Sequence, residues 1–172
     1  SNQWALNFVN NNISFKDLTT LKIGGKIKYF FEVRNKKELV EKVGFAKKNK
    51  VAIIILGGGS DILAGDRNFN GVVIKYVNNK LQIINNKLVA GAGVIWDDLV
   101  KETVDKNFSG VERLSGIPGT VGAAPIQNIG AYGQELSDTF VSLTAYDIEN
   151  RKFTKFNKDD CHFGYRKSIF KD

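Results

Sequence analysis

The sequence has few of the residues that carry most acid–base and metal chemistry. Its 172 residues include one cysteine, Cys161, and one histidine, His162. A single cysteine excludes an internal disulfide framework and a cluster of thiolate ligands. A single histidine argues against a His-based zinc site and against a Ser-His-Asp triad. We therefore interpret both residues as structural and expect no protein-bound metal.

Long hydrophobic runs are missing as well. A membrane helix needs roughly 20 apolar residues, whereas the longest run here covers residues 51–56. The first residues also lack the basic, apolar and small-residue pattern of a signal peptide. The sequence therefore predicts a cytoplasmic globular protein without a membrane partner.

Positive charge is in excess but dispersed. The chain has 25 Lys+Arg against 18 Asp+Glu, and lysines outnumber arginines 20 to 5. A nucleic-acid-binding stripe is usually denser and richer in arginine. We therefore expect a solvated surface that also attracts anionic ligands, and no nucleic-acid partner.

The first part of the chain, residues 15–75, has the pattern of a small β-α-β unit. Strands are expected at residues 29–33, 51–56 and 71–75, and a helix at residues 35–50, with Asn35 as its cap and Glu38 completing a capping box. The continuous β-branched run at residues 51–56 indicates a parallel strand that is buried on both faces. The predicted inner face of the helix consists of Leu39, Val40, Val43 and Ala46.

The remainder, residues 76–172, has an antiparallel pattern. Hairpins are expected over residues 81–92 and 141–156, with turns at residues 85–86 and 149–150. The predicted fold class is therefore α+β, a parallel unit followed by an antiparallel-sheet unit with helices. A helix is expected at residues 95–107, with Trp96, Leu99, Val100 and Val104 on its inner face.

Three segments carry functional information. The sequence Gly57-Gly58-Gly59-Ser60 follows a strand, and its free amides could cradle a phosphate, although a tight turn explains it equally well. It is neither a Walker A loop nor a G-x-G-x-x-G loop.

Residues 114–133 hold five glycines and both prolines with few charges, which favours contact with a flat apolar ligand over a merely buried segment. In residues 161–168, Arg166 could hold a carboxylate or stabilise developing negative charge.

Taken in order, these segments resemble one family. The chain is similar to the UDP-N-acetylenolpyruvoylglucosamine reductases, also called UDP-N-acetylmuramate dehydrogenases, of bacterial peptidoglycan synthesis. The motifs that carry the resemblance are LTTLKIGG at residues 18–25, ILGGGS at 55–60, AGAG at 90–93 with Trp96, IPGTVG at 117–122, PIQNIGAYG at 125–133 and FGYR at 163–166.

The resemblance implies an FAD-binding fold of the vanillyl-alcohol-oxidase (PCMH) type, with FAD-binding subdomains at residues 15–75 and 76–172. FAD would be the cofactor, NADPH the co-substrate, and the UDP-sugar enolpyruvyl ether the substrate. The resemblance makes Arg166 catalytic and places Gln127, Asn128, Tyr132 and Tyr165 near the flavin or substrate. The implied cofactor-binding residues are Gly57, Gly58, Gly59, Ser60, Asp61, Ile117, Pro118, Gly119, Thr120, Gly122 and Ala123.

The sequence also departs from the family pattern. Asp61 stands where the family usually has Asn, Ala123 and Ala124 where Gly or Ser is common, and Lys167 where an acidic residue is frequent. The family's serine proton donor and catalytic glutamate belong to a further C-terminal substrate domain, which would be this chain's partner. We expect the isolated chain to be inactive in the full reaction and assign neither role to Ser168 or Glu135.

Two other interpretations stay open at this point. The chain could belong to another FAD-linked oxidoreductase of the same fold. It could also be a non-catalytic basic module that binds nucleic acid or another anionic polymer, with purely structural glycine loops.

Overall fold

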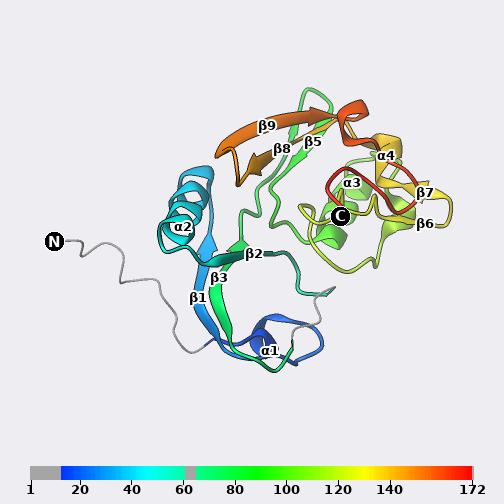
Figure 1. The fold of residues 1–172 in the computed structure, drawn as a ribbon. Helices are drawn as coiled ribbons and strands as arrows, with labels where there is room; N and C mark the ends of the chain where they lie inside the picture. The colour runs from blue at the N-terminus through cyan, green and yellow to red at the C-terminus, as the bar shows by residue number, and fades with distance from the viewer. Residues whose placement is uncertain (1–12, 61–64, 172) are drawn as a thin grey trace. The chain divides into compact units, whose positions relative to one another are not determined.

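The structure is a computed structural model that describes residues 13–60 and 65–171 (Figure 1). Its internal contacts divide the chain into two compact units, a first unit up to Asn78 and a second unit from Asn79. Among the described residues, no helix has both the length and the apolar character needed to span a bilayer. The two units are described one after the other.

A parallel three-stranded sheet forms the first unit, in the order β1-β3-β2. It consists of β1 (Ile27–Val33), β2 (Ala52–Leu56) and β3 (Phe69–Tyr76), and α2 (Lys36–Lys48) connects β1 to β2 (Figure 1). The parallel β-α-β unit predicted from the sequence is confirmed.

Helix α2 begins at the predicted cap, Asn35, but without the predicted capping box, because Glu38 bonds to the N–H of Arg34 and not to that of Asn35. The Asn35 side chain accepts a hydrogen bond from the Glu38 backbone N–H at 2.9 Å, and the Glu38 carboxylate accepts one from the Arg34 N–H at 2.7 Å. These bonds satisfy N–H groups that lack partners inside the helix. The ring of Phe45 packs edge-on against Tyr29 and Phe31 of β1, with centroids 5.2 and 5.6 Å apart.

Helix α1 (Phe15–Leu18) contributes a second hydrophobic cluster to the first unit. Phe15 packs with Ile27, Phe30, Leu56 and Val73. Ile27 and Phe30 are three residues apart, so a regular strand would direct them to opposite faces. The β1–β3 pairing shifts register between Ile27 and Tyr29, and this irregularity accounts for their shared cluster.

Two details of the first unit correct the sequence expectations. Strand β2 is not buried on both faces: it lies at the sheet edge beside the central β3, and Ile55 is 49% exposed. Helix α2 buries Val43 and Ala46 but leaves Val40 exposed. The apolar run identified a parallel strand without specifying its place in the sheet.

The second unit contains antiparallel hairpins. Both predicted hairpins are confirmed, as β4 (Leu81–Ile84) with β5 (Lys87–Ala90), and β8 (Ser142–Asp147) with β9 (Lys152–Asn157). A third, very short hairpin joins β6 (Gly130–Ala131) to β7 (Gln134–Glu135). The remaining short elements are α4 (Leu136–Thr139) and 3₁₀ turns at Glu112–Leu114 and Asp159–Cys161.

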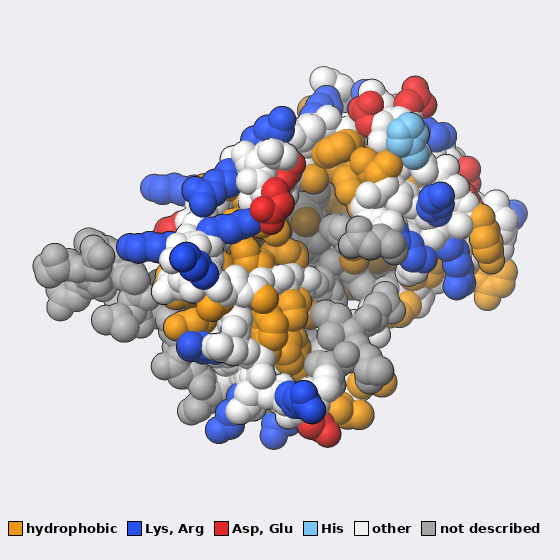
Figure 2. Space-filling model, in the orientation of Figure 1, with side chains coloured by type: hydrophobic (Ala, Val, Ile, Leu, Met, Phe, Trp, Pro, Cys, Tyr) orange, Lys and Arg blue, Asp and Glu red, His pale blue; other side chains and the backbone are white. Residues whose placement is uncertain are grey.

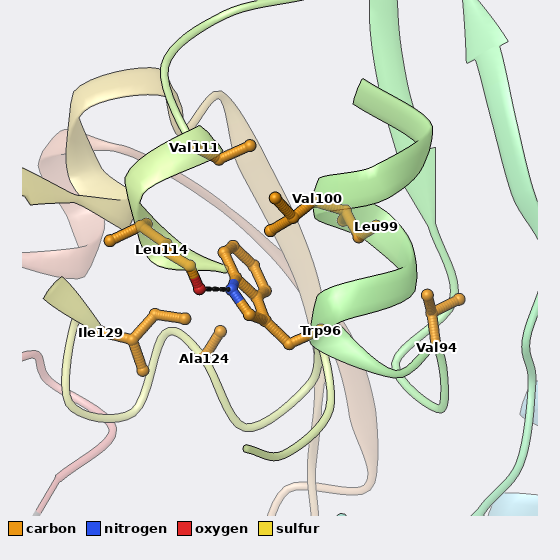
Figure 3. Close-up of a cluster of buried hydrophobic side chains, with 8 residues drawn as sticks. All are labelled: Val94, Trp96, Leu99, Val100, Val111, Leu114, Ala124 and Ile129. Atoms are coloured by element: carbon orange, nitrogen blue, oxygen red, sulfur yellow. Dashed lines mark hydrogen bonds between the residues drawn. The ribbon is translucent and has the colours of Figure 1, made fainter. Parts of the chain in front are cut away.

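The core of the second unit surrounds Trp96, the first residue of α3 (Trp96–Asp105) (Figure 3). Trp96 is 2% exposed, and its indole N–H donates to the Leu114 carbonyl at 2.9 Å. The buried face of α3 includes Thr103, whereas Val104 is 51% exposed, which corrects the predicted inner face. The cluster comprises Val94, Trp96, Leu99, Val100, Val111, Leu114, Ala124 and Ile129.

We expect Trp96→Phe to lower the free energy of unfolding by about 3 kcal/mol. The substitution leaves the Leu114 carbonyl without its donor and opens a cavity in the core. Urea unfolding followed by circular dichroism measures the effect. Val104→Ala, on the exposed face of the same helix, is the control and should stay within about 0.5 kcal/mol of wild type.

Candidate flavin-binding site

The glycine loop, residues 57–60, follows β2 at the edge of the sheet where the parallel strands end. Ligands of parallel α/β sheets bind outside these carboxyl ends. Gly59 is buried with φ +75°, and a Cβ there would collide with the Leu18 carbonyl oxygen. Gly58 is exposed. The loop therefore directs one glycine inward and leaves another open to an approaching ligand.

The segment with Thr19 and Thr20 packs against the glycine loop and hydrogen-bonds to it. The Gly59 carbonyl accepts hydrogen bonds from the Thr20 backbone N–H at 3.1 Å and from the Thr20 hydroxyl at 3.4 Å. Thr19 is buried, and its hydroxyl donates to the Ile23 carbonyl at 3.5 Å. The family motif at residues 18–25 gave no prediction that these threonines support the loop, although two hydroxyls shortly before a glycine pair were a usable signal.

The chain after the glycine loop packs tightly against the same segment. The Gly25 N–H donates to the Gly65 carbonyl at 3.1 Å, and a Cβ on Gly25 would lie 2.7 Å from the Asp66 carbonyl oxygen. Asp61, which the sequence predicts beside the cofactor, lies outside the described residues.

The whole excess of positive charge belongs to the first unit. Residues 1–78 hold 13 Lys+Arg and 6 Asp+Glu, whereas residues 79–172 hold 12 of each. Figure 2 shows Lys and Arg side chains gathered along α2. The unit that carries the glycine loop is thus the one that attracts anions.

In the second unit, two of the family motifs pair with each other. The Trp96 N–H donates to the Gly119 carbonyl at 3.0 Å, and the Gly122 N–H donates to the Ala92 carbonyl at 2.9 Å. Thr120 forms a β-bridge with Ile95. A Cβ on Gly122 would lie 2.7 Å from the Cβ of Ala92, so only glycine permits this approach.

The glycine-rich segment, residues 114–133, contributes to the core as well as to the surface. Ala124 and Ile129 are core residues, and Ile117 packs against the same cluster. Pro118 is exposed and Ala123 is half-buried. The interpretation as buried structure therefore holds for Ala124 and Ile129, and ligand contact by the exposed residues stays a prediction.

Asp97 anchors the start of the glycine-rich segment. Its carboxylate accepts hydrogen bonds from the Gly116 N–H at 2.8 Å and from the Ser115 hydroxyl at 2.7 Å. The Gly116 bond, followed by the Ser115 bond, lowers the pKa of Asp97 below its ordinary value, so the carboxylate keeps these bonds to more acidic pH than an unbonded aspartate would allow.

Tyr132 lies at the tip of the β6–β7 hairpin, which we call the tyrosine hairpin. Tyr132 and Gly133 have φ +51° and +78°, the pattern of a tight two-residue turn. The Arg113 guanidinium donates to the Tyr132 carbonyl at 3.1 Å, and the Arg113 N–H donates to the Gln134 side chain at 2.8 Å. The backbone is held while the Tyr132 side chain stays 83% exposed.

Tyr165 and Arg166 lie at the tip of a second tight turn, residues 164–167, which we call the arginine turn. The N–H of each of Gly164 and Lys167 donates to the other's carbonyl at 3.0 Å, and Arg166 has φ +48°. Tyr165 is 85% exposed and Arg166 is also exposed. Both side chains are thus exposed at the tip of a closed backbone turn.

The remaining predicted residues differ in exposure. Asn128 is 1% exposed and bonded within the second unit, whereas Gln127 is half-buried. Cys161 is fully buried, and desolvation, followed by the charge of Asp160, raises the pKa of its thiol. A protonated, inaccessible thiol makes no nucleophile, and His162 lies exposed in a left-handed turn position.

Comparison with known proteins gives a consistent result. A family model described as an FAD binding domain matches residues 27–152. The UDP-N-acetylenolpyruvoylglucosamine reductase of Thermobifida fusca is 41% identical over 165 residues, which cover 93% of this chain and 46% of that protein. The chain therefore spans about half the length of the curated relatives it matches.

Solved structures agree on the fold. The crystal structure of UDP-N-acetylenolpyruvylglucosamine reductase from Thermus caldophilus superimposes with a TM-score of 0.77 at 28% identity, covering 91% of this chain and 55% of that one. The 6-hydroxy-D-nicotine oxidase of Arthrobacter nicotinovorans gives 0.61 at 21% identity, covering 79% and 31%. The predicted α+β fold of the vanillyl-alcohol-oxidase type is confirmed.

We expect Gly59→Ala to destabilise the first unit by more than the roughly 1–2 kcal/mol of left-handed backbone strain, because the Leu18 carbonyl must also move. Gly44→Ala, inside α2 where a Cβ meets open space, should instead stabilise the same unit by about 0.5–1 kcal/mol. Urea unfolding of both variants measures the difference. Equal effects of the two substitutions would contradict the close approach at Gly59.

Proposed function

Because the chain belongs to the family of FAD-binding domains, we propose that it is the FAD-binding part of an NADPH-dependent reductase. The reaction is the conversion of UDP-N-acetylglucosamine enolpyruvate to UDP-N-acetylmuramate in peptidoglycan synthesis, in the cytoplasm. The observation that carries the proposal is the 41% identity to a reductase of that name along 93% of the chain. The structural likeness to the oxidase, at 21% identity, concerns the fold alone and favours no other reaction.

The first unit has the features needed to hold the FAD pyrophosphate. The glycine loop offers backbone amides without side chains at the carboxyl end of a parallel sheet, and Ser60 adds a hydroxyl donor. The net positive charge of this unit favours a dianionic group there. The glycine-rich segment of the second unit is the part that the resemblance assigns to the rest of the cofactor.

The glycine loop and the glycine-rich segment would hold FAD, which would supply the hydride transfer from NADPH to the enolpyruvyl group, a chemistry that no side chain supplies. The chain's own contribution is electrostatic. As the double bond is reduced, negative charge develops next to the substrate carboxylate, and the permanently charged Arg166 stabilises that charge more than it stabilises the ground state. The arginine turn fixes the Arg166 backbone and leaves its guanidinium exposed to an approaching substrate.

We expect the purified chain to bind one FAD. Titration should quench flavin fluorescence and raise the unfolding temperature, and at a hundredfold excess over Kd the stabilisation should be about 2.7 kcal/mol. Gly59→Ala should weaken binding, whereas Gly44→Ala should not. A chain that neither quenches the flavin nor gains stability, but binds DNA in a salt-sensitive manner, would instead support the basic binding module.

We expect Arg166→Ala to slow one half-reaction selectively in the full-length reductase. Oxidation of reduced FAD by the enolpyruvyl substrate should slow by about 10²–10³-fold, the usual effect of removing one charge-stabilising group, while reduction of FAD by NADPH should change little. Stopped-flow absorbance separates the two steps. Arg151→Ala, at the exposed β8–β9 turn, is the matched control, and equal losses in both half-reactions would rule out the assignment.

A further inference from the structure

The buried side chain of Asn128 joins three segments of the second unit. Its Nδ2 donates to the Glu135 carboxylate at 2.8 Å, to the Ser137 hydroxyl at 3.4 Å and to the Gly164 carbonyl at 3.2 Å. Its Oδ1 accepts from the Ser137 backbone N–H at 3.0 Å. One carboxamide thus connects the PIQNIGAYG motif with the end of the tyrosine hairpin and the start of the arginine turn.

The partners of Asn128 require an amide at this position. The Ser137 N–H can only donate, whereas the Gly164 carbonyl and the ionised Glu135 carboxylate can only accept. An aspartate would keep the first contact, lose the other two and face Glu135 with a like charge. An apolar side chain would leave every partner unsatisfied, which is unfavourable because the site is 1% exposed.

A second tie joins the same two segments. Ser168 is 2% exposed, and its hydroxyl donates to the Ile126 carbonyl at 2.7 Å while accepting from the Phe170 N–H at 3.1 Å. The arginine turn is therefore fixed at both ends, by Asn128 at Gly164 and by Ser168 just after Lys167. Between these ties the side chains of Tyr165, Arg166 and Lys167 are exposed.

The Glu135 contact extends this arrangement to the tyrosine hairpin. Glu135 pairs with Gly130 across the hairpin whose tip carries Tyr132. Asn128 therefore holds two backbone segments. One is the tyrosine hairpin, which carries Tyr132, and the other is the arginine turn, which carries Tyr165 and Arg166.

We infer that Asn128 is a positioning residue that ties the arginine turn to the end of the tyrosine hairpin and so places the backbone that carries Arg166. Ser168 supports it from the other end of the turn. The functional half of this inference rests on the proposed reductase activity, in which Arg166 acts on the anionic substrate. The structural half concerns hydrogen bonds of the second unit alone.

The structural half is tested by hydrogen exchange of the Gly164 and Lys167 amides in the isolated chain. Asn128→Asp should accelerate exchange at both amides at least tenfold. Asn150→Asp is the matched control, because Asn150 also donates to a carboxylate, that of Asp147 at 2.7 Å, but in the exposed β8–β9 turn. It should leave the Gly164 and Lys167 amides unchanged.

A second pair of variants keeps this test decisive if Asn128→Asp fails to fold. Ser168→Ala removes the other tie without adding charge and should also accelerate exchange in the arginine turn, whereas Ser168→Thr, which keeps the hydroxyl, should restore slow exchange. Wild-type exchange rates at Gly164 and Lys167 in the folded variants would overturn the inference.

The functional half is tested by a double-substitution cycle in the full-length reductase. Asn128→Asp should slow substrate reduction by about 10–100-fold, as expected for a misplaced group, without changing FAD affinity. In the Arg166→Ala background it should cause no further slowing. If the rate losses of the two substitutions multiply in the double variant, Asn128 does not act through Arg166. If the wild-type full-length protein does not catalyse the reaction, the proposed function is refuted. The positioning role of Asn128 is then decided by the hydrogen-exchange measurements alone.

Discussion

Close backbone contact between irregular segments is the constraint on which the candidate site depends. At Gly59, Gly25 and Gly122 a neighbouring main chain or methyl group occupies the space of a Cβ. Each contact is accompanied by backbone hydrogen bonds that satisfy groups lying outside regular strands. Segments that must expose backbone to a ligand on one side are thus anchored by backbone on the other. This requirement explains why glycine clusters in these segments better than flexibility does.

The scarcity of reactive side chains has a separate explanation. The proposed reaction takes its hydride chemistry from a cofactor, so the chain needs no histidine, cysteine thiolate or metal ligand. The side chains that matter present charge or surface, and they lie at the tips of turns. The buried polar residues Asn128 and Ser168 have side chains that hydrogen-bond to other parts of the chain. Chemistry and support are therefore assigned to different residues of the same motifs.

Local sequence patterns determined most of the fold. The cap at Asn35, both long hairpins and the parallel strands were predictable, because capping, turn composition and apolar runs act over a few residues. Position within the sheet was not predictable. Nothing in residues 52–56 indicates that β3 takes the centre or that Ile55 is exposed, because both depend on which distant segments pack against the strand. The prediction that Val104 lies on the inner face of α3 was also wrong, because helical periodicity gives the width of the buried face only approximately.

The candidate site was predictable in its residues and less so in its connections. The glycine loop, Tyr132 and Arg166 follow from motifs, but the hydrogen bonds that hold them join residues up to 42 positions apart. Such ties depend on tertiary packing, so a linear pattern carries no signal for them. Asn128 illustrates the consequence. As part of a recognisable motif it was expected beside a ligand, yet its donors and acceptor are directed to Glu135, Ser137 and Gly164. A residue can therefore belong to a family motif because it supports the structure of the site, and not only because it touches the ligand.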